Sequence, residues 1–182
     1  MSTELNSSQM NQLQQIESVT ADWWVDRLQG TNINSVTLLA TDYLNHFNEV
    51  IILIKMVADM PDMIEDVLAW EPKSYWQHFA DSGFKDKKLA IEAYVAAPED
   101  LKALFDARVA CLNGNIFKTQ QRLKNVDPEA LEEALAEYVR VSVDKFHRLV
   151  EKINSVVNGG TVKATPAEAE ASCAQAEIDA LF

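Results

Sequence analysis

The sequence predicts an all-α, four-helix-bundle-like fold with an aromatic-rich helical insertion and a flexible C-terminal tail. Of the 182 residues, 48% are hydrophobic, whereas only 5 are Gly and 5 are Pro. This composition favours long helices, because many short strands would need more turn residues. Apolar residues also recur every three or four positions along most of the chain, which is the period of an amphipathic helix. A chain of this length is expected to form one domain with a tail.

The first two predicted helices precede an insertion. After a polar segment, 1–10, which is expected to be disordered, apolar residues at helical spacing predict a helix that ends near Gly30. A second helix is expected to begin at a capping side chain, Asn32, Asn34 or Ser35, and to end at the next proline. Its apolar run VIILI is expected to lie deepest in the core.

The rest of the bundle domain, which spans 11–157, divides into an insertion and two long helices. Residues 61–97 are rich in Trp, Tyr and Phe and are interrupted by Pro and Gly. They predict short helices that cover one end of the core, or a binding surface. The third long helix is expected over 98–124 and the fourth over 127–157, because each begins with a Pro followed by an acidic residue.

The C-terminal tail divides into a linker and a terminal peptide. Residues 158–171 begin with Asn-Gly-Gly and continue with small and charged residues, so they predict a flexible linker. An apolar pattern returns in 172–182, at Ile178, Leu181 and Phe182. A peptide of this length is not a stable helix alone in water. It is therefore expected to fold on the surface of a partner.

Charge and hydropathy exclude several classes of partner. The net charge is -12, with 28 acidic residues against 16 Lys and Arg. Such a chain repels nucleic acid and anionic membrane surfaces, and it favours a partner with a basic patch. The sequence has no apolar run long enough to span a bilayer, and its polar N-terminus does not resemble a signal peptide. The expected compartment is the cytoplasm.

The two cysteines and the absence of common ligand motifs argue against a cofactor. Cys111 and Cys173 lie far apart, without a Cys-x-x-Cys spacing, which disfavours a disulfide framework and a zinc site. The sequence contains no glycine-rich phosphate loop and no Gly-x-Ser-x-Gly motif. We therefore expect no cofactor.

The end of the chain, QAEIDALF, resembles a known docking peptide. It is similar to the N-terminal peptide of the flagellar motor switch protein, Leu-Ser-Gln-x-Glu-Ile-Asp-x-Leu-Leu, and to the C-terminus of the chemotaxis phosphatase CheZ. Both bind a CheY-like response regulator as a helix lying in a groove. Ala174 differs from the Ser of the family. The resemblance implies apolar anchors at Ile178, Leu181 and Phe182, and polar contacts at Gln175, Glu177 and Asp179.

The same resemblance raises the alternative of a response-regulator phosphatase. Enzymes of this signalling class use an acid and an amide on one exposed helix, where the amide orients the attacking water. The Asp-x-x-x-Gln spacing of CheZ is absent here. The Glu-x-x-Asn spacing of another chemotaxis phosphatase group is matched by Glu151 and Asn154 and approached by Asp42 and Asn45. At about 100° per residue, Glu151 and Asn154 are predicted to be exposed.

A second alternative is a helical protein that binds a metal or a small ligand. His46 and Glu49 continue the polar stripe of Asp42 and Asn45, and they could join Asp144 and His147 in a carboxylate–histidine site. The latter two residues, however, lie opposite the apolar stripe of their helix, and no Glu-x-x-His motif is present. We therefore expect no metal site, and a polar helix interface instead. His78 is expected to be a surface histidine, and the bundle could also dimerise.

Overall fold

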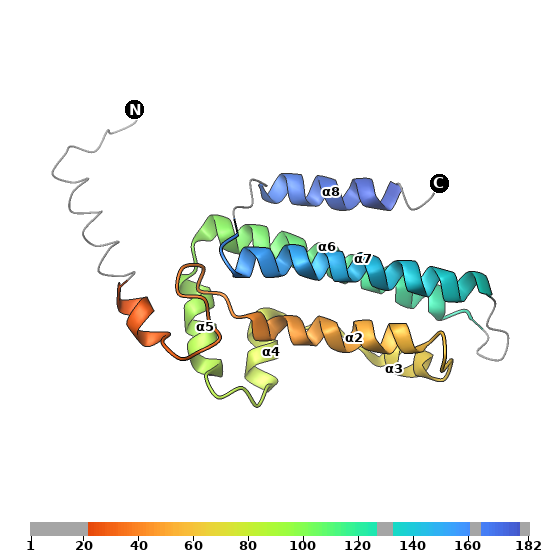
Figure 1. The fold of residues 1–182 in the computed structure, drawn as a ribbon, viewed down its shortest axis with the longest axis horizontal. Coiled ribbons are helices and arrows are strands. Elements are labelled where there is room, and N and C mark those ends of the chain that lie inside the picture. The colour runs from red at the N-terminus through yellow and green to blue at the C-terminus, as the bar shows by residue number, and fades with distance from the viewer. Residues whose placement is uncertain (1–21, 127–132, 161–164, 179–182) are drawn as a thin grey trace.

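The computed structural model describes residues 22–126, 133–160 and 165–178. In this part of the chain the regular secondary structure is helical and no strand is present, which confirms the all-α prediction (Figure 1). Residues 22–27 are helical. The other helices are η1 (Thr41–Leu44), α2 (Asn45–Met56), α3 (Met63–Ala69), α4 (Tyr75–Asp81), α5 (Lys87–Ala96), α6 (Glu99–Leu123), α7 (Glu133–Val157) and α8 (Pro166–Ile178).

The helices form three layers, with α6 and α7 in the middle (Figure 1). These two long helices run antiparallel, α2 and α3 cover one side of them, and α8 lies on the other side against α6. Large apolar side chains fill the space between α2, α6 and α7, and each contributes roughly 2 kcal/mol by leaving water. Those that are almost completely buried include Phe47, Ile54, Leu112, Ile116, Phe146 and Ile153.

The third predicted helix matches α6 closely, and the fourth matches the described part of α7. Pro98 immediately precedes α6, and Glu99 and Asp100 occupy its first turn, where acidic side chains stabilise the positive end of the helix dipole. The end of α7 at Val157 is as predicted. Its expected start lies outside the described residues, as does most of the first predicted helix together with 1–10.

The second predicted helix begins later than the sequence indicated. The side chain of Asn34 accepts hydrogen bonds from the backbone N–H of Val36 at 2.9 Å and of Thr37 at 3.0 Å. This makes a turn rather than a helix cap. Leu38 then adopts a positive φ of 60°, which no α-helix accommodates. Helical structure therefore starts only at Thr41.

The apolar run of α2 is amphipathic in the structure rather than buried on all sides. Val50, Ile51 and Ile54 are buried, whereas Ile52 is 56% exposed. The reason is that α2 packs against η1, α3 and α7 but lies at the edge of the bundle. The prediction that this run lies entirely in the core is therefore wrong for Ile52.

The insertion 61–97 folds into α3, α4 and α5, and α4 and α5 lie at one end of the long helices (Figure 1). Tyr75 and Phe79 of α4 are buried. The Tyr75 ring lies 5.2 Å from that of Tyr43 and stacks on that of Tyr94 of α5 with ring centroids 4.4 Å apart. The Tyr75 hydroxyl accepts a hydrogen bond from the backbone N–H of Ala40 at 2.9 Å. The insertion thus closes one end of the core, although Trp76 is 60% exposed.

The C-terminal tail differs from the prediction, because much of the expected linker 158–171 is helical. Helix α8 begins at Pro166 and continues past 171, where the linker was expected to end. Thr165 and Glu168 form a capping box: the Glu168 carboxylate accepts from the Thr165 N–H at 2.7 Å, and the Thr165 hydroxyl accepts from the Glu168 N–H at 3.2 Å. The prediction of a flexible linker is therefore wrong for 166–171, and 161–164 lie outside the described residues.

A disulfide joins Cys173 of α8 to Cys111 of α6, with the two Cα atoms 5.9 Å apart. This corrects the expectation that the two cysteines stay unpaired. They are separated by 62 positions, and only the packing of α8 on α6 brings them together.

Among the helices of the described part, none combines the length and the apolar character that crossing a membrane requires.

Candidate functional site

The two acid–amide pairs singled out from the sequence meet in one cavity, the polar pocket, of about 330 Å³. Asp42 and Asn45 come from η1 and the start of α2, and Glu151 and Asn154 come from the end of α7. They meet because α2 and α7 run antiparallel, so the first turn of one lies beside the last turns of the other. The pocket is lined by Asn32, Thr41, Asp42, Leu44, Asn45, Asn48, Val150, Glu151 and Asn154.

Polar side chains of this pocket are exposed to solvent, and one buried carboxylate oxygen lacks a hydrogen-bond partner. Glu151, Asn154 and Asn45 are exposed, as the helical phase predicted for the first two. The Asn154 side-chain oxygen accepts a hydrogen bond from Asn158 Nδ2 at 2.9 Å. The amide nitrogen of Asn154 is therefore the group that can donate to a ligand. Asp42 Oδ2 is shielded from solvent and has no hydrogen-bond partner among the described residues. A buried oxygen without a partner is costly, so a ligand donor at this oxygen would be favourable.

The charge of the polar pocket defines what it can bind. Its lining combines two carboxylates with four Asn side chains and contains no Lys, Arg or His. Such a lining repels a free phosphate ion, because no cation is present to balance the charge. It suits a donor-rich or cationic group, or a phosphorylated partner that supplies its own cations.

A second cavity, the histidine pocket, lies beside it and has a volume of about 250 Å³. It is lined by Asn45, His46, Glu49, Lys73, His78, Asp81 and Ser82. The backbone N–H of Lys73 donates to His46 Nε2 at 3.0 Å, and the His46 ring stacks on Trp70 with centroids 4.7 Å apart. Burial, aided by the positive charges of His78 and Lys73, lowers the pKa of His46 to about 4. His46 is therefore neutral at physiological pH.

His78 is not the simple surface histidine that the sequence suggested. It is half-buried, with its ring 5.6 Å from that of Tyr43 and 5.9 Å from that of His46. Burial lowers the pKa of His78, partly offset by its hydrogen bond to the backbone of Asp42. The difference arises because α4 folds back onto η1 and carries His78 toward the core.

The proposed carboxylate–histidine metal set is not assembled. His46 and Glu49 line the histidine pocket, whereas Asp144 and His147 line a different cavity. The Nε2 atom of His46 is already occupied by the Lys73 N–H. Within the described ranges, no three His, Cys, Asp or Glu side chains come together in a way that could hold a metal ion.

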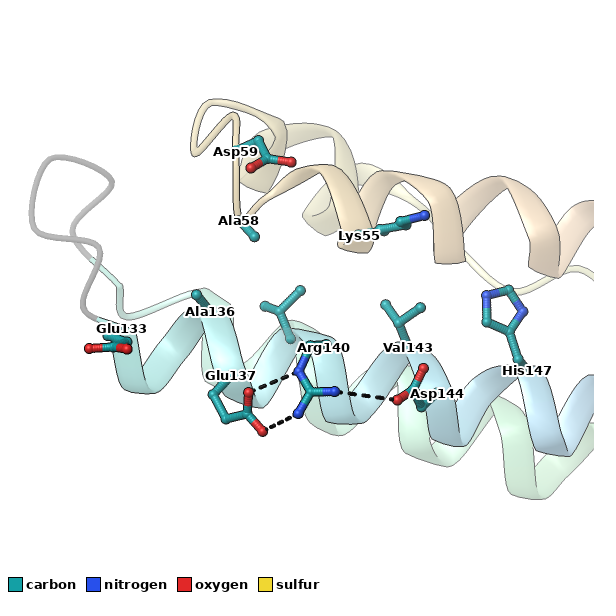
Figure 2. A pocket seen from close by; sticks show the side chains of 11 residues that line it. Lys55, Ala58, Asp59, Glu133, Ala136, Glu137, Arg140, Val143, Asp144 and His147 are labelled. Carbon is teal, nitrogen blue, oxygen red and sulfur yellow. Dashed lines mark hydrogen bonds and ion pairs between the residues drawn. The ribbon is translucent and has the colours of Figure 1, made fainter.

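A third cavity, the α2–α7 groove, was not predicted from the sequence. It encloses about 890 Å³ between the end of α2 and the first half of α7 (Figure 2). Ala58 and Ala136 leave space where the two helices face each other, and Val139 and Val143 form a buried floor. At the rim, Arg140 pairs with Glu137 at 2.5 Å and approaches Asp144 at 3.9 Å. An apolar floor with a charged rim resembles a protein-binding groove.

No family model, no curated protein and no solved structure matches this chain.

The docking peptide predicted for 172–182 is described only in part. Its backbone continues helix α8 to Ile178. Cys173 is half-buried and disulfide-bonded. Gln175 and Glu177 lie in the last turns of this helix, whereas Asp179, Leu181 and Phe182 lie outside the described residues.

Proposed function

We propose that this chain is a cytoplasmic signalling adaptor that binds a CheY-like response regulator through residues 172–182. The observation that carries the proposal is that the peptide QAEIDALF, which resembles known regulator-binding peptides, continues directly from helix α8. A helix is the conformation in which such peptides lie in a groove, with apolar anchors inward and acidic groups toward basic residues.

The charge of the whole chain supports the same kind of partner. The net charge of -12 attracts a protein that presents a basic patch, and opposite fields raise the rate of encounter. Nucleic acid and anionic membranes carry the same sign as this protein and would be repelled. Binding is accordingly proposed to weaken as salt screens these charges.

Binding is tested by titrating the full chain with the CheY-like regulator of the same genome, activated with beryllium fluoride. The double variant Ile178→Ala/Leu181→Ala is expected to bind at least about 30-fold more weakly, because buried anchor residues carry most of the energy of such interfaces. Glu170→Ala is the matched control, because Glu170 is an exposed residue of α8 before the motif. Equal affinity of the parent and the double variant would remove the proposal.

A second candidate function is aspartyl-phosphate hydrolysis on the bound regulator, and the polar pocket favours it. Two acid–amide pairs line that one cavity, and Asn158 Nδ2 donates to the Asn154 side-chain oxygen, which leaves the Asn154 amide nitrogen available to donate. In this proposal the Asn154 amide orients a water toward the phosphoryl group, and the Glu151 carboxylate pairs with a cation of the regulator's active site. The phosphate's charge is balanced by the regulator, since the pocket has no cation of its own.

This second candidate is tested by following the decay of aspartyl phosphate on the regulator. The parent is expected to accelerate the decay, and Asn154→Ala to lower that acceleration by about 100-fold, which is typical when one preorganised donor is removed. Asn125→Ala is the control, because Asn125 is an exposed asparagine just after the end of α6 and does not line the polar pocket. If the parent does not accelerate the decay, hydrolysis is excluded while the adaptor proposal stands.

A further inference from the structure

We propose that α8 is a preformed docking helix, clamped to α6 by a reversible Cys111–Cys173 disulfide, and that its partner-binding side is the one that faces away from α6. This inference rests on the proposed function and adds two things to it: the orientation of the docking surface and its control by oxidation. It differs from a peptide on a free tether, which is what the sequence suggested.

The orientation follows from the exposure of the α8 side chains. Pro166, Ala169 and Cys173 are partly buried, whereas Ala167 and Ala171 are exposed. The first three positions lie within about 60° of one another around the helix, and this side faces α6 through the disulfide. The α8 helix therefore has a fixed inner side and a fixed outer side.

The last described position of the docking motif, 178, falls on the outer side of the helix. Position 178 lies seven residues after the exposed Ala171, hence on the same side of the helix, and about 140° around the axis from Cys173. A partner that approaches from outside the bundle would thus meet position 178 without displacing α8.

The disulfide is the strongest link between α8 and the bundle. The inner side of α8 consists of small residues, and no described side chain of α8 is fully buried. Little apolar area therefore holds the helix on α6, and a helix of 13 residues is marginal by itself. Asn115 of α6 flanks the bond, with its Nδ2 atom 3.6 Å from Cys173 Sγ and 3.7 Å from Cys111 Sγ.

The bond can form and break by thiol–disulfide exchange. Both cysteines are partly exposed, so a small thiol can reach them. In oxidation, one cysteine thiolate attacks a low-molecular-weight disulfide and releases one thiolate, and the second cysteine then attacks the mixed disulfide and releases the other. Two protein thiols are oxidised and one external disulfide is reduced to two thiols. A dithiol reductant reverses both steps.

Oxidation is expected to strengthen partner binding. In the oxidised protein the docking segment is already helical as far as position 178 and is held on α6, so less conformational freedom is lost on binding. Reduction frees α8, and the segment must then order itself on the partner. In a cytoplasmic protein such a bond is typical of redox sensing rather than of permanent stabilisation.

The test uses the full chain, oxidised with glutathione disulfide or reduced with dithiothreitol, and two readouts. Amide hydrogen exchange of 165–178 is measured with α2 as internal reference, and affinity is measured for the regulator activated with beryllium fluoride. We expect reduction to accelerate exchange in 165–178 by at least about tenfold and to weaken binding about fivefold. The variant Cys173→Ser should match the reduced parent under both conditions.

The outcomes separate the clamp from the docking function. Unchanged exchange on reduction or two free thiols after oxidation would overturn the clamp, and an equal, measurable affinity in both states would overturn its control of binding. If the regulator binds in neither state while reduction still accelerates exchange in 165–178, the docking function fails and the clamp of α8 on α6 survives.

Discussion

At the scale of single residues, His46 links the histidine pocket to pH. Its pKa falls from 6.5 to about 4 in the folded protein, first because it is buried and then because His78 and Lys73 lie nearby. In the unfolded chain His46 takes up a proton near pH 6.5, whereas in the folded chain it resists protonation down to about pH 4. The unfolded state therefore binds more protons within this window, and stability falls as the pH falls through it.

We predict that the substitution His46→Gln reduces this loss of stability. Glutamine keeps an acceptor for the Lys73 N–H but does not titrate. Urea midpoints measured from about pH 7 to about pH 4.5 should fall less steeply in the variant than in the parent. His147→Gln, which changes an exposed histidine of α7, serves as the control and should keep the parent's slope. Parallel curves for the parent and His46→Gln would contradict the prediction.

Residue chemistry also explains which parts of the candidate site could be predicted. The exposure of Glu151 and Asn154 follows from a 100° step per residue and was correctly inferred. Glu151 and Asn154 share one pocket with Asp42 and Asn45. This arrangement depends on how far α2 overlaps α7, which no local sequence pattern predicts. For the same reason the half-buried position of His78 was missed, because it depends on α4 folding back onto η1.

At the scale of elements, the side chain of Gln120 links α6 to α3 through hydrogen bonds. Gln120 of α6 is buried, and its Nε2 atom donates to the carbonyl of Val67 at 2.8 Å and to that of Trp70 at 2.9 Å. Both acceptors lie at the end of α3. The side chain thus replaces the backbone donors that the last turn of α3 lacks.

We predict that Gln120→Ala lowers the free energy of unfolding by about 2–3 kcal/mol, because both carbonyls lose a hydrogen bond in a partly dry environment. Gln121→Ala offers a matched control, since Gln121 is the next residue of α6 and is exposed. That variant should differ from the parent by less than about 0.5 kcal/mol. Urea denaturation measures both, and similar losses in the two variants would refute the proposed role of Gln120.

Helices were predicted correctly where a clear helix-start signal is present. They were predicted wrongly where side chains form hydrogen bonds with backbone N–H groups that a helix would otherwise use. Helix α6 begins at its Pro-Glu-Asp signal, as expected. The segment before α2 contains apolar residues at helical spacing, but Asn34 holds the backbone in a turn instead. Helix α8 was missed because its small and charged residues were interpreted as a linker, although Thr165 and Glu168 form a capping box at its start. Its packing on α6 depends on tertiary structure, which no local pattern predicts.

At the scale of the whole molecule, the disulfide restricts the unfolded chain as well as placing α8. It joins two positions separated by 62 residues, so it closes a loop that contains half of α6 and all of the described part of α7. We predict that reduction lowers the free energy of unfolding by about 2–4 kcal/mol. Denaturation with and without dithiothreitol measures the change.

The double variant Cys111→Ser/Cys173→Ser is the control for this measurement. It should have the stability of the reduced parent and should not respond to the reductant. A parent whose denaturation midpoint is the same in both conditions would show that the bond does not constrain the unfolded chain.

A hydrogen bond between two residues that are far apart in the sequence affects when the chain can fold during its synthesis. The Thr37 hydroxyl donates to the carbonyl of Val157 at 2.6 Å, across 120 positions of sequence. Helix α2 likewise packs on α7, which a ribosome synthesises only after α3, α4, α5 and α6. A nascent chain must therefore hold the apolar face of α2 without this partner until α7 has emerged, so the contacts between the two helices form late.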